Sequence, residues 1–501
     1  MPEIPRVDES ELPEPERQVG FIELEPAAYA APLEYRNPDL TSGRARLFYS
    51  FVPADTDAKD KPLFVIFNGG PGGTSMYLYT LGTGPLTLDA QDFNVDPIPN
   101  DHSFTSLGNL LYIDSRGAGF SYNLADDPAA QAERSAAADI GSYNPTVDGA
   151  DFVRVVLRVM RKIPAIRNNP VVLLGESYGG VRAGVMLAIA TAVRDRPGPT
   201  QLCVDAALEA ELDEHFQAVF PGVSSERLDP RARAKQFGWQ VLIQPLVAGQ
   251  TQNQAMEAIF EDELARMAAE AGLTPAELVA ERCRFDSSEP QAWCDQMTNG
   301  VSRAVTAPST YTALMAVAPE LVPGLRAAER GTAFRFVEVE SRTEQSALFG
   351  ALGELASWDS YYEPFASPSA PGAFTTAVDQ NIYGLFFAQT LRYTHTLITN
   401  ARWDTVILSE AIVPALRSLF DTASPRLIAD AWFVPPSEEG ERPTRFVVEF
   451  ADTEGFTGPH EREVFFPTYA NSGHYVTAKE GAKLRDDIAA FLAETGLASS
   501  R

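Results

Sequence analysis

The stretch VVLLGESYGG, residues 171–180, decides how this sequence folds. Its first four residues are apolar, as in a buried strand, and residues 181–193 after it are compatible with a helix. Between the two, Gly175 and Gly179 flank Ser177 in the pattern Gly-x-Ser-x-Gly. A sharp turn from strand to helix strains the serine and brings the backbones close together, so it leaves no room for side chains on either side. The stretch therefore predicts that Ser177 stands at a strained turn, where it acts as a nucleophile.

Further apolar runs indicate that this strand belongs to a larger sheet. They have the length and the β-branched or aromatic content of buried strands, and they span residues 63–67, 109–113, 239–243 and 396–399. A helix with one apolar face is predicted over residues 152–163, and another over residues 484–492. The alternation of strands with helices predicts the α/β fold class, with a mostly parallel central sheet flanked by helices.

The pattern along the chain divides it into four parts. Residues 1–40 are an acidic, Pro-rich tail and lead-in segment that offers little to a core, and residues 41–249 hold the first part of an α/β core. Residues 250–368 are helix-rich, with an apolar stripe from Met256 onward, and predict an inserted helical cap. Residues 369–501 complete the core.

The net charge of −28, from 40 basic and 68 acidic residues, argues against some classes of partner. Such an acidic surface repels phosphate backbones and anionic lipids, so we expect no nucleic-acid binding. No run of about 18 apolar residues occurs, so we also expect no membrane insertion. The start of the chain lacks the basic and apolar regions of a secretory signal. The protein is then cytoplasmic, or it is secreted or periplasmic if the sequence begins after a removed signal.

The three cysteines do not form an even disulfide framework. Cys283 and Cys294 are close enough in sequence to be bridged in an oxidising compartment, and two inert buried thiols are the alternative. No cluster of cysteine and histidine has the spacing of zinc ligands, so we expect no metal. The chemistry predicted below needs no cofactor.

A glycine-rich loop, NGGPGG at residues 68–73, follows the predicted strand at residues 63–67. A tight turn is its simplest interpretation. Backbone N–H groups in such a loop can also stabilise the oxyanion that forms during acyl transfer, and each donor contributes roughly 100- to 1000-fold in rate. We therefore predict an oxyanion hole formed by the backbone amides of Gly70 and Tyr178.

Three motifs, in this order, are similar to the successive motifs of serine carboxypeptidases. They are NGGPGG at residues 68–73, NLLYID at 109–114 leading to GAGFSY at 117–122, and GESYGG at 175–180. The resemblance covers residues 45–190 and 385–495, and it points to a bacterial-like, divergent member. It implies an α/β-hydrolase fold and a serine hydrolase that cleaves C-terminal residues from peptides through an acyl-enzyme. A peptide or a small acyl compound is the implied substrate.

A serine becomes a good nucleophile only when a neighbouring base takes its proton. His474 lies in the segment SGHY, residues 472–475, just before the predicted terminal helix, and this segment resembles the Gly-His element of the family. The sequence has five histidines, and the other four lack this setting: His102, His215, His395 and His460. We predict His474 as the general base and expect surface or structural roles for the others.

The base in turn needs a carboxylate that orients it. In α/β hydrolases the acid follows the nucleophile and precedes the histidine in the chain. Asp404 ends the segment LITNARWD, residues 397–404, in which a predicted strand leads into a loop. We predict Asp404 as the acid, with Asp421 and Glu410 as alternatives. The predicted triad is Ser177, Asp404 and His474.

The resemblance also implies a site for the terminal carboxylate of the substrate. Members of the family bind it with an asparagine, a tryptophan and two glutamates. Asn68 and Glu176 match two of these positions, and Gly69 lies beside Asn68 in the predicted substrate-binding set. Ile66 stands at the tryptophan position and Gly82 at the second glutamate position. Half of this carboxylate clamp is therefore missing.

Because half of the carboxylate clamp is missing, other functions on the same fold are also possible interpretations of the sequence. An esterase, an acyltransferase or a differently directed peptidase, for example an aminopeptidase-like enzyme, is the alternative to a carboxypeptidase. The segment DSRG, residues 114–117, faintly resembles proline iminopeptidases, although GESYG at 175–179 fits serine carboxypeptidases better. A non-catalytic binding protein conflicts with a complete set of serine, aspartate and histidine.

Overall fold

The computed structural model describes most of the predicted core. The described residues are 13–29, 40–69, 73–87, 98–116, 118, 120–124, 145–191, 206–223, 230–247, 252, 255, 265, 269, 272–274, 384, 386–401, 404, 407, 409–422, 431–434, 444–450, 460–470, 472 and 474–497. The predicted cap, residues 250–368, falls outside them apart from single positions, as do all three cysteines. The division into domains and the Cys283–Cys294 bridge therefore stay predictions.

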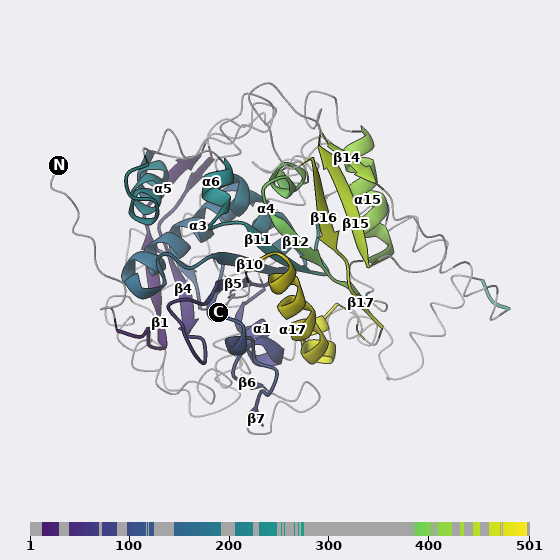
Figure 1. Cartoon of the computed structure of the whole chain (residues 1–501), viewed down its shortest axis with the longest axis horizontal. Helices are drawn as coiled ribbons and strands as arrows, with labels where there is room; N and C mark the ends of the chain where they lie inside the picture. The colour runs from purple at the N-terminus through teal and green to yellow at the C-terminus, as the bar shows by residue number, and fades with distance from the viewer. Residues whose placement is uncertain are drawn as a thin grey trace.

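Six parallel strands form the middle of the central sheet, and all five predicted strands are among them. In order across the sheet they are β8 (Asn109–Ile113), β5 (Leu63–Phe67), β10 (Val171–Glu176), β11 (Trp239–Ile243), β12 (His395–Ile398) and β16 (Glu461–Phe465). Every residue of β5, β8 and β10 is buried, because helices cover both faces of a parallel sheet. The predicted mostly parallel sheet is confirmed (Figure 1).

Antiparallel strands complete the sheet on both sides. They are β1 (Gln18–Leu24) and β4 (Ala45–Val52) on one side, with β9 (Tyr122–Asn123) beside β4, and β15 (Arg445–Phe450) and β14 (Ala431–Val434) on the other. β1 corrects the expectation that residues 1–40 offer little to a core. It pairs along its whole length with β4, and the Leu24 side chain is fully buried. The nearby prolines hid this strand because they lie outside it, at positions that need not donate to the ladder.

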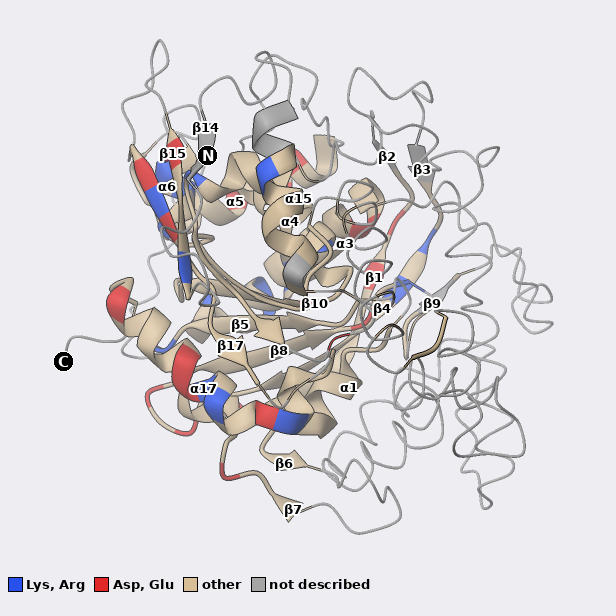
Figure 2. Ribbon diagram, turned by 90° about the vertical axis from the view of Figure 1, so that its right-hand side faces the viewer, with Lys and Arg blue, Asp and Glu red and all other residues tan. Residues whose placement is uncertain are grey.

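Helices lie on both faces of the sheet, as Figures 1 and 2 show. One face carries α3 (Pro145–Lys162), α4 (Gly179–Ala190), α5 (Ala206–Val219) and α15 (Ser409–Thr422). The other carries α1 (Met76–Leu78) and α17 (Val476–Glu494). The remaining short elements are β2 (Ala27–Tyr29), β3 (Leu40–Ser42), β6 (Leu86–Thr87), β7 (Ile98–Pro99), α6 (Pro230–Ala234), β13 (Asn400–Ala401), β17 (Thr468–Tyr469), the π-helix Tyr79–Thr83 and the 3₁₀ turns Phe104–Ser106 and Pro164–Ile166.

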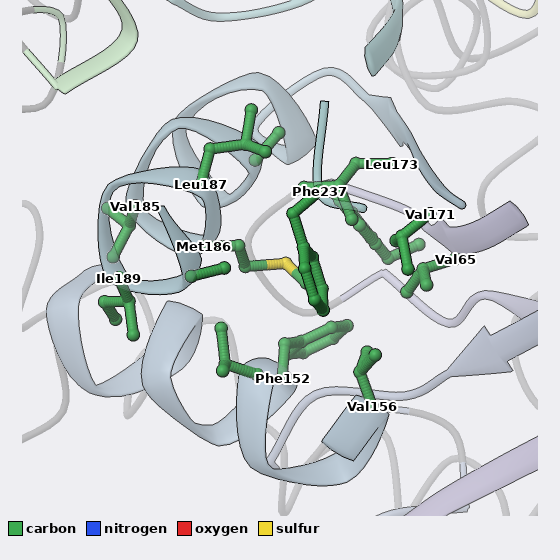
Figure 3. Close-up of a cluster of buried hydrophobic side chains, with 14 of the residues drawn as sticks. Val65, Phe152, Val156, Val171, Leu173, Val185, Met186, Leu187, Ile189 and Phe237 are labelled. Carbon is green, nitrogen blue, oxygen red and sulfur yellow. The ribbon is translucent and has the colours of Figure 1, made fainter. Parts of the chain in front are cut away.

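The core between the sheet and the helices α3 and α4 fixes the helix that follows Ser177. Figure 3 shows Phe152 of α3 and Met186 of α4 directed toward Val65 and Leu173 of the sheet. All four side chains are buried, and a fully buried side chain of this kind stabilises the fold by about 1.5–3 kcal/mol. This packing holds α4 against α3 and the central sheet.

The architecture is that of an α/β hydrolase, as the sequence predicts. The strands next to β10 are parallel to it, so the ends of β10, β11 and β12 meet at one edge of the sheet. Within the described part of the chain, the helices are too short or too polar to cross a membrane. Asn68, Ser177 and Asp404 follow strands at that edge, and Glu176 is the last residue of β10.

Candidate active site

Ser177 lies at a strained turn between the strand β10 and the helix α4. Its φ of +58° is in the left-handed region, which non-glycine residues rarely adopt. Backbone hydrogen bonds hold the turn: the Ser177 amide donates to the Ile243 carbonyl at 2.9 Å, and the Ser177 carbonyl accepts from the Gly180 and Leu246 amides at 2.9 and 2.8 Å. The predicted strand, turn and helix around Ser177 are all present.

The glycine-rich loop presses against this turn. A Cβ atom on Gly69 would lie 2.5 Å from the Glu176 carbonyl oxygen, 2.6 Å from the Ser177 Cβ and 2.6 Å from the Tyr178 amide nitrogen. Position 69 therefore requires glycine, because any side chain would occupy the space over the Tyr178 amide. Gly70 lies outside the described residues, so its amide as an oxyanion donor stays a prediction.

A buried arginine that the sequence analysis missed anchors the loop. Arg182 of α4 donates from Nε to Asp148 Oδ2 of α3 at 2.8 Å and from Nη1 to the carbonyl of Asn68 at 2.5 Å. Its guanidinium also lies 4.3 Å from the ring centre of Phe152. A charged residue within the otherwise apolar stretch 181–193 was the available signal. The contacts join the loop to both helices that pack behind Ser177.

Asn68 uses its side chain within the same loop. Its Oδ1 accepts from the Gly69 amide at 2.7 Å, and its Nδ2 donates to the Thr74 carbonyl at 3.4 Å. An amide NH₂ group has two donors, and one of them has no partner among the described residues.

His474 and Asp404 form the predicted hydrogen-bonded pair. His474 Nδ1 lies 2.9 Å from Asp404 Oδ2, and the Asp404 side chain is fully buried. Asp404 follows β13, and its Oδ1 accepts from the Ile407 amide at 2.9 Å. The alternatives, Asp421 and Glu410, lie on α15.

The surroundings of His474 favour its protonated form. Burial alone would lower the pKa of the imidazole, but the charge and hydrogen bond of Asp404 raise it, and Glu176 adds to this effect. The net direction is upward. Asp404 thus stabilises the imidazolium that a general base forms when it accepts a proton.

Gln244, which the sequence analysis also missed, holds the carboxylate of Asp404. It directly follows β11, has a φ of +45° and is fully buried. Its Nε2 donates to Asp404 Oδ2 and to Ser409 Oγ, both at 2.8 Å. Its Oε1 accepts from the Ala401 amide at 2.8 Å and from Thr399 Oγ1 at 3.0 Å. The Ala401 donor fixes which end of the amide faces the carboxylate. A polar residue directly after an apolar strand was the only signal.

Glu176 is a buried carboxyl group without a hydrogen-bond partner in the described part of the chain. It is 1% exposed and is the only charged residue of β5, β8, β10 and β11. Burial raises its pKa to about 7, while His474 opposes the shift and Asp404 adds to it. Below that pH the side chain is a neutral acid that can donate a hydrogen bond.

Two of the remaining histidines have structural surroundings. His215 is buried, bonds to Gln236 Oε1 at 2.9 Å and has a pKa that burial lowers to about 4. The His395 ring stacks on Trp239 with ring centres 5.5 Å apart. These contacts fit the structural roles expected for both residues.

The fold and this strained serine turn define the class of α/β hydrolases, and sequence comparison relates one segment of the chain to a family. The serine carboxypeptidase family model matches residues 35–192. Serine carboxypeptidase-like 21 of Arabidopsis thaliana is 27% identical over 164 residues, which are 32% of this chain and 29% of that protein. The venom serine carboxypeptidase of Apis mellifera is 33% identical over 137 residues, which are 27% of this chain and 26% of that protein.

The resemblance to serine carboxypeptidases is thus confirmed for this N-terminal segment, which spans less than a third of each of these two relatives. They come from a plant and an insect, and the expected bacterial-like character is not borne out. Among solved structures, Kex1(delta)p, a prohormone-processing carboxypeptidase from Saccharomyces cerevisiae, is similar with a TM-score of 0.45 and 14% identity. That match covers 97% of this chain and 93% of the other.

Replacing Asp404 by asparagine should lower kcat by roughly 10⁴-fold with little change in KM, because the imidazole loses the charge that stabilises its protonated form. Hydrolysis of a p-nitrophenyl ester measures this. Asp486→Asn, at a largely exposed position on α17, is the matched control. Near-normal activity of Asp404→Asn would move the role of the acid to another residue.

Replacing Gln244 by alanine should lower kcat about 10- to 100-fold, because the Asp404 carboxylate loses a hydrogen bond, and a hydrogen bond to a charged group contributes about this much. Without this donor the Asp404 charge acts more strongly on His474, so the acid limb of the kcat/KM profile should move to higher pH. Gln240→Ala is the control, because Gln240 is equally buried on β11 but bonds to Thr394 and Thr396 instead. Equal losses in both variants would mean that Gln244 acts only on stability.

Proposed function

We propose that this protein is a serine hydrolase that releases C-terminal residues from peptides through an acyl-enzyme. One observation carries the proposal: Ser177, at a φ of +58° beneath the Gly69 loop, shares one edge of the sheet with the Asp404–His474 pair. The family match over residues 35–192 includes the serine turn and the loop.

In this proposal Ser177 Oγ attacks the scissile carbonyl, and His474 accepts its proton on Nε2, because Nδ1 is bonded to Asp404. The amides of Tyr178 and Gly70 donate to the oxyanion of the tetrahedral intermediate. His474 then donates the proton to the leaving amine, and an acyl ester remains on Ser177. A water molecule, activated by the same base, hydrolyses the ester.

Glu176 supports release from the C-terminus. It directly precedes Ser177, and as a neutral acid it can donate a hydrogen bond to a substrate carboxylate. Asn68 has one further amide hydrogen for the same anion. A buried acid beside the nucleophile contributes no hydrogen bond to the described part of the fold, so a role toward substrate accounts for it.

A second candidate is an esterase, an acyltransferase or a differently directed peptidase with the same triad. Ile66 and Gly82 favour it, because they replace two residues that would bind a terminal carboxylate in the family. Ile66 is fully buried inside β5, where it cannot reach a ligand.

A peptide library in free-acid and C-terminally amidated forms separates these functions. Mass spectrometry should find single residues released from free-acid peptides, and little change in the amides. Ser177→Ala should abolish both this cleavage and covalent labelling by a fluorophosphonate, while the melting temperature stays nearly constant. Internal or N-terminal cuts would favour the second candidate, and labelling that persists in Ser177→Ala would displace Ser177 as nucleophile.

The pH dependence of substrate binding tests Glu176. Its pKa of about 7 predicts a neutral donor below pH 7 and a repelling carboxylate above it. The KM of free-acid peptides should therefore rise above pH 7, by up to about tenfold per pH unit, whereas the KM of matched amides should not. Glu176→Gln should flatten this difference, because glutamine donates at any pH, and Glu214→Gln on α5 serves as the control. Identical pH curves for both substrate forms in the wild type would rule out this role.

A further inference from the structure

The position where the family resemblance places a second glutamate cannot hold one in this backbone. Gly82 has a φ of +143°, which residues with side chains rarely adopt. A Cβ atom there would lie 2.4 Å from the Thr477 carbonyl oxygen at the start of α17. The segment that holds Gly82 is closed against α17, so any replacement for the missing clamp residue must come from elsewhere.

Two tyrosines occupy this junction. The rings of Tyr77 in α1 and Tyr475, which directly follows His474, have centres 4.9 Å apart at an angle of 43°. Tyr77 is 4% exposed, and the pair packs with Leu81 and Ala478. These apolar neighbours shield the pair from water.

Several buried polar atoms at this junction have no hydrogen-bond partner among the described residues. The Tyr77 hydroxyl and both carboxyl oxygens of Glu176 are buried and form no hydrogen bond of good geometry to any described residue. Burial is the main cause of the raised pKa of Tyr77, and the charge of Glu176 and a contact between the Tyr77 and Tyr475 hydroxyls add to it. Buried polar groups normally have hydrogen-bond partners, so a bound ligand is the natural partner for these three atoms.

We propose that Tyr77 and Tyr475, together with Glu176, bind the terminal carboxylate of the peptide substrate and replace the missing half of the clamp. This inference rests on the proposed carboxypeptidase function. It also explains how the site can bind a peptide with a free C-terminal carboxylate although Ile66 and Gly82 provide no polar group.

The chemistry of the three groups suits a carboxylate. An ionised carboxylate leaves water only when hydrogen bonds compensate for its lost hydration. The two hydroxyls and a neutral Glu176 can supply three donors once the Tyr77 hydroxyl turns from Tyr475 toward the substrate. Burial raises the pKa of Tyr475 to about 12 and that of Tyr77 further, so both stay neutral donors across the working pH range. Glu176 alone would make the site depend on a single proton.

The experiment replaces each tyrosine by phenylalanine, singly and together, and compares kcat/KM for a free-acid peptide with that for its C-terminal amide. We expect the ratio of the two to fall about 10- to 100-fold in each single variant, as for a lost hydrogen bond to a charged group. Tyr79→Phe should keep the wild-type ratio, because the Tyr79 hydroxyl accepts from Arg17 at 2.8 Å and faces another partner. The melting temperatures establish that the variants are folded.

The outcomes separate this inference from the function on which it rests. If the wild type prefers free acids and the phenylalanine variants keep that preference, the tyrosines only pack, and the inference is wrong while the function stands. If the wild type shows no preference for free acids, the proposed function fails and the inference fails with it. The inference is also wrong if the ratio of kcat/KM for the free acid to that for the amide falls as much in Tyr79→Phe as in Tyr77→Phe.

Discussion

The left-handed backbone of Ser177 is the constraint on which the rest of the site depends. A non-glycine residue at a φ of +58° is unfavourable by about 1–3 kcal/mol and persists only where its surroundings hold it. Here both backbone groups of Ser177 are bonded to the segment around the end of β11, at Ile243 and Leu246. On the other side, the backbone of Gly69 packs directly against the turn and leaves no space for it to move. Ser177 stays partly accessible to solvent because the neighbouring backbone holds it at the turn.

The end of β11 connects the nucleophile with the acid. Ile243 accepts from the amide of Ser177, and the next residue, Gln244, donates to Asp404. The register sets this connection, since Glu176 lies opposite Ile243 on one side of the strand and Leu242 lies opposite Ile398 on the other. A shift of β11 by one residue would displace the serine turn and the acid together. The strand thus acts as a common support for two predicted catalytic residues, Ser177 and Asp404, that are more than 200 residues apart in the chain.

Sequence patterns predicted the parts of this structure that depend on local chemistry. Strands buried on both faces appear as unbroken apolar runs, so β5, β8 and β11 were predicted with the observed bounds. Gln244 and Arg182 were missed because their roles depend on partners 160 and 114 residues away, at Asp404 and Asn68. The sequence around a single polar residue in an apolar segment does not indicate which distant residue it will contact. β1 was missed for a related reason, since only its pairing with β4 makes it a strand.

In the proposed mechanism, the protonation of Glu176 couples substrate binding to the pKa of His474. While Glu176 is neutral, it donates to an anion and adds no charge beside His474. Once it ionises above about pH 7, it repels a substrate carboxylate, and its charge also raises the pKa of His474. A higher pKa keeps more of the imidazole protonated, and a protonated imidazole cannot accept the serine proton. The same ionisation therefore weakens binding of a free acid and moves the deprotonation of His474 to higher pH, so one buried carboxyl group links binding with catalysis.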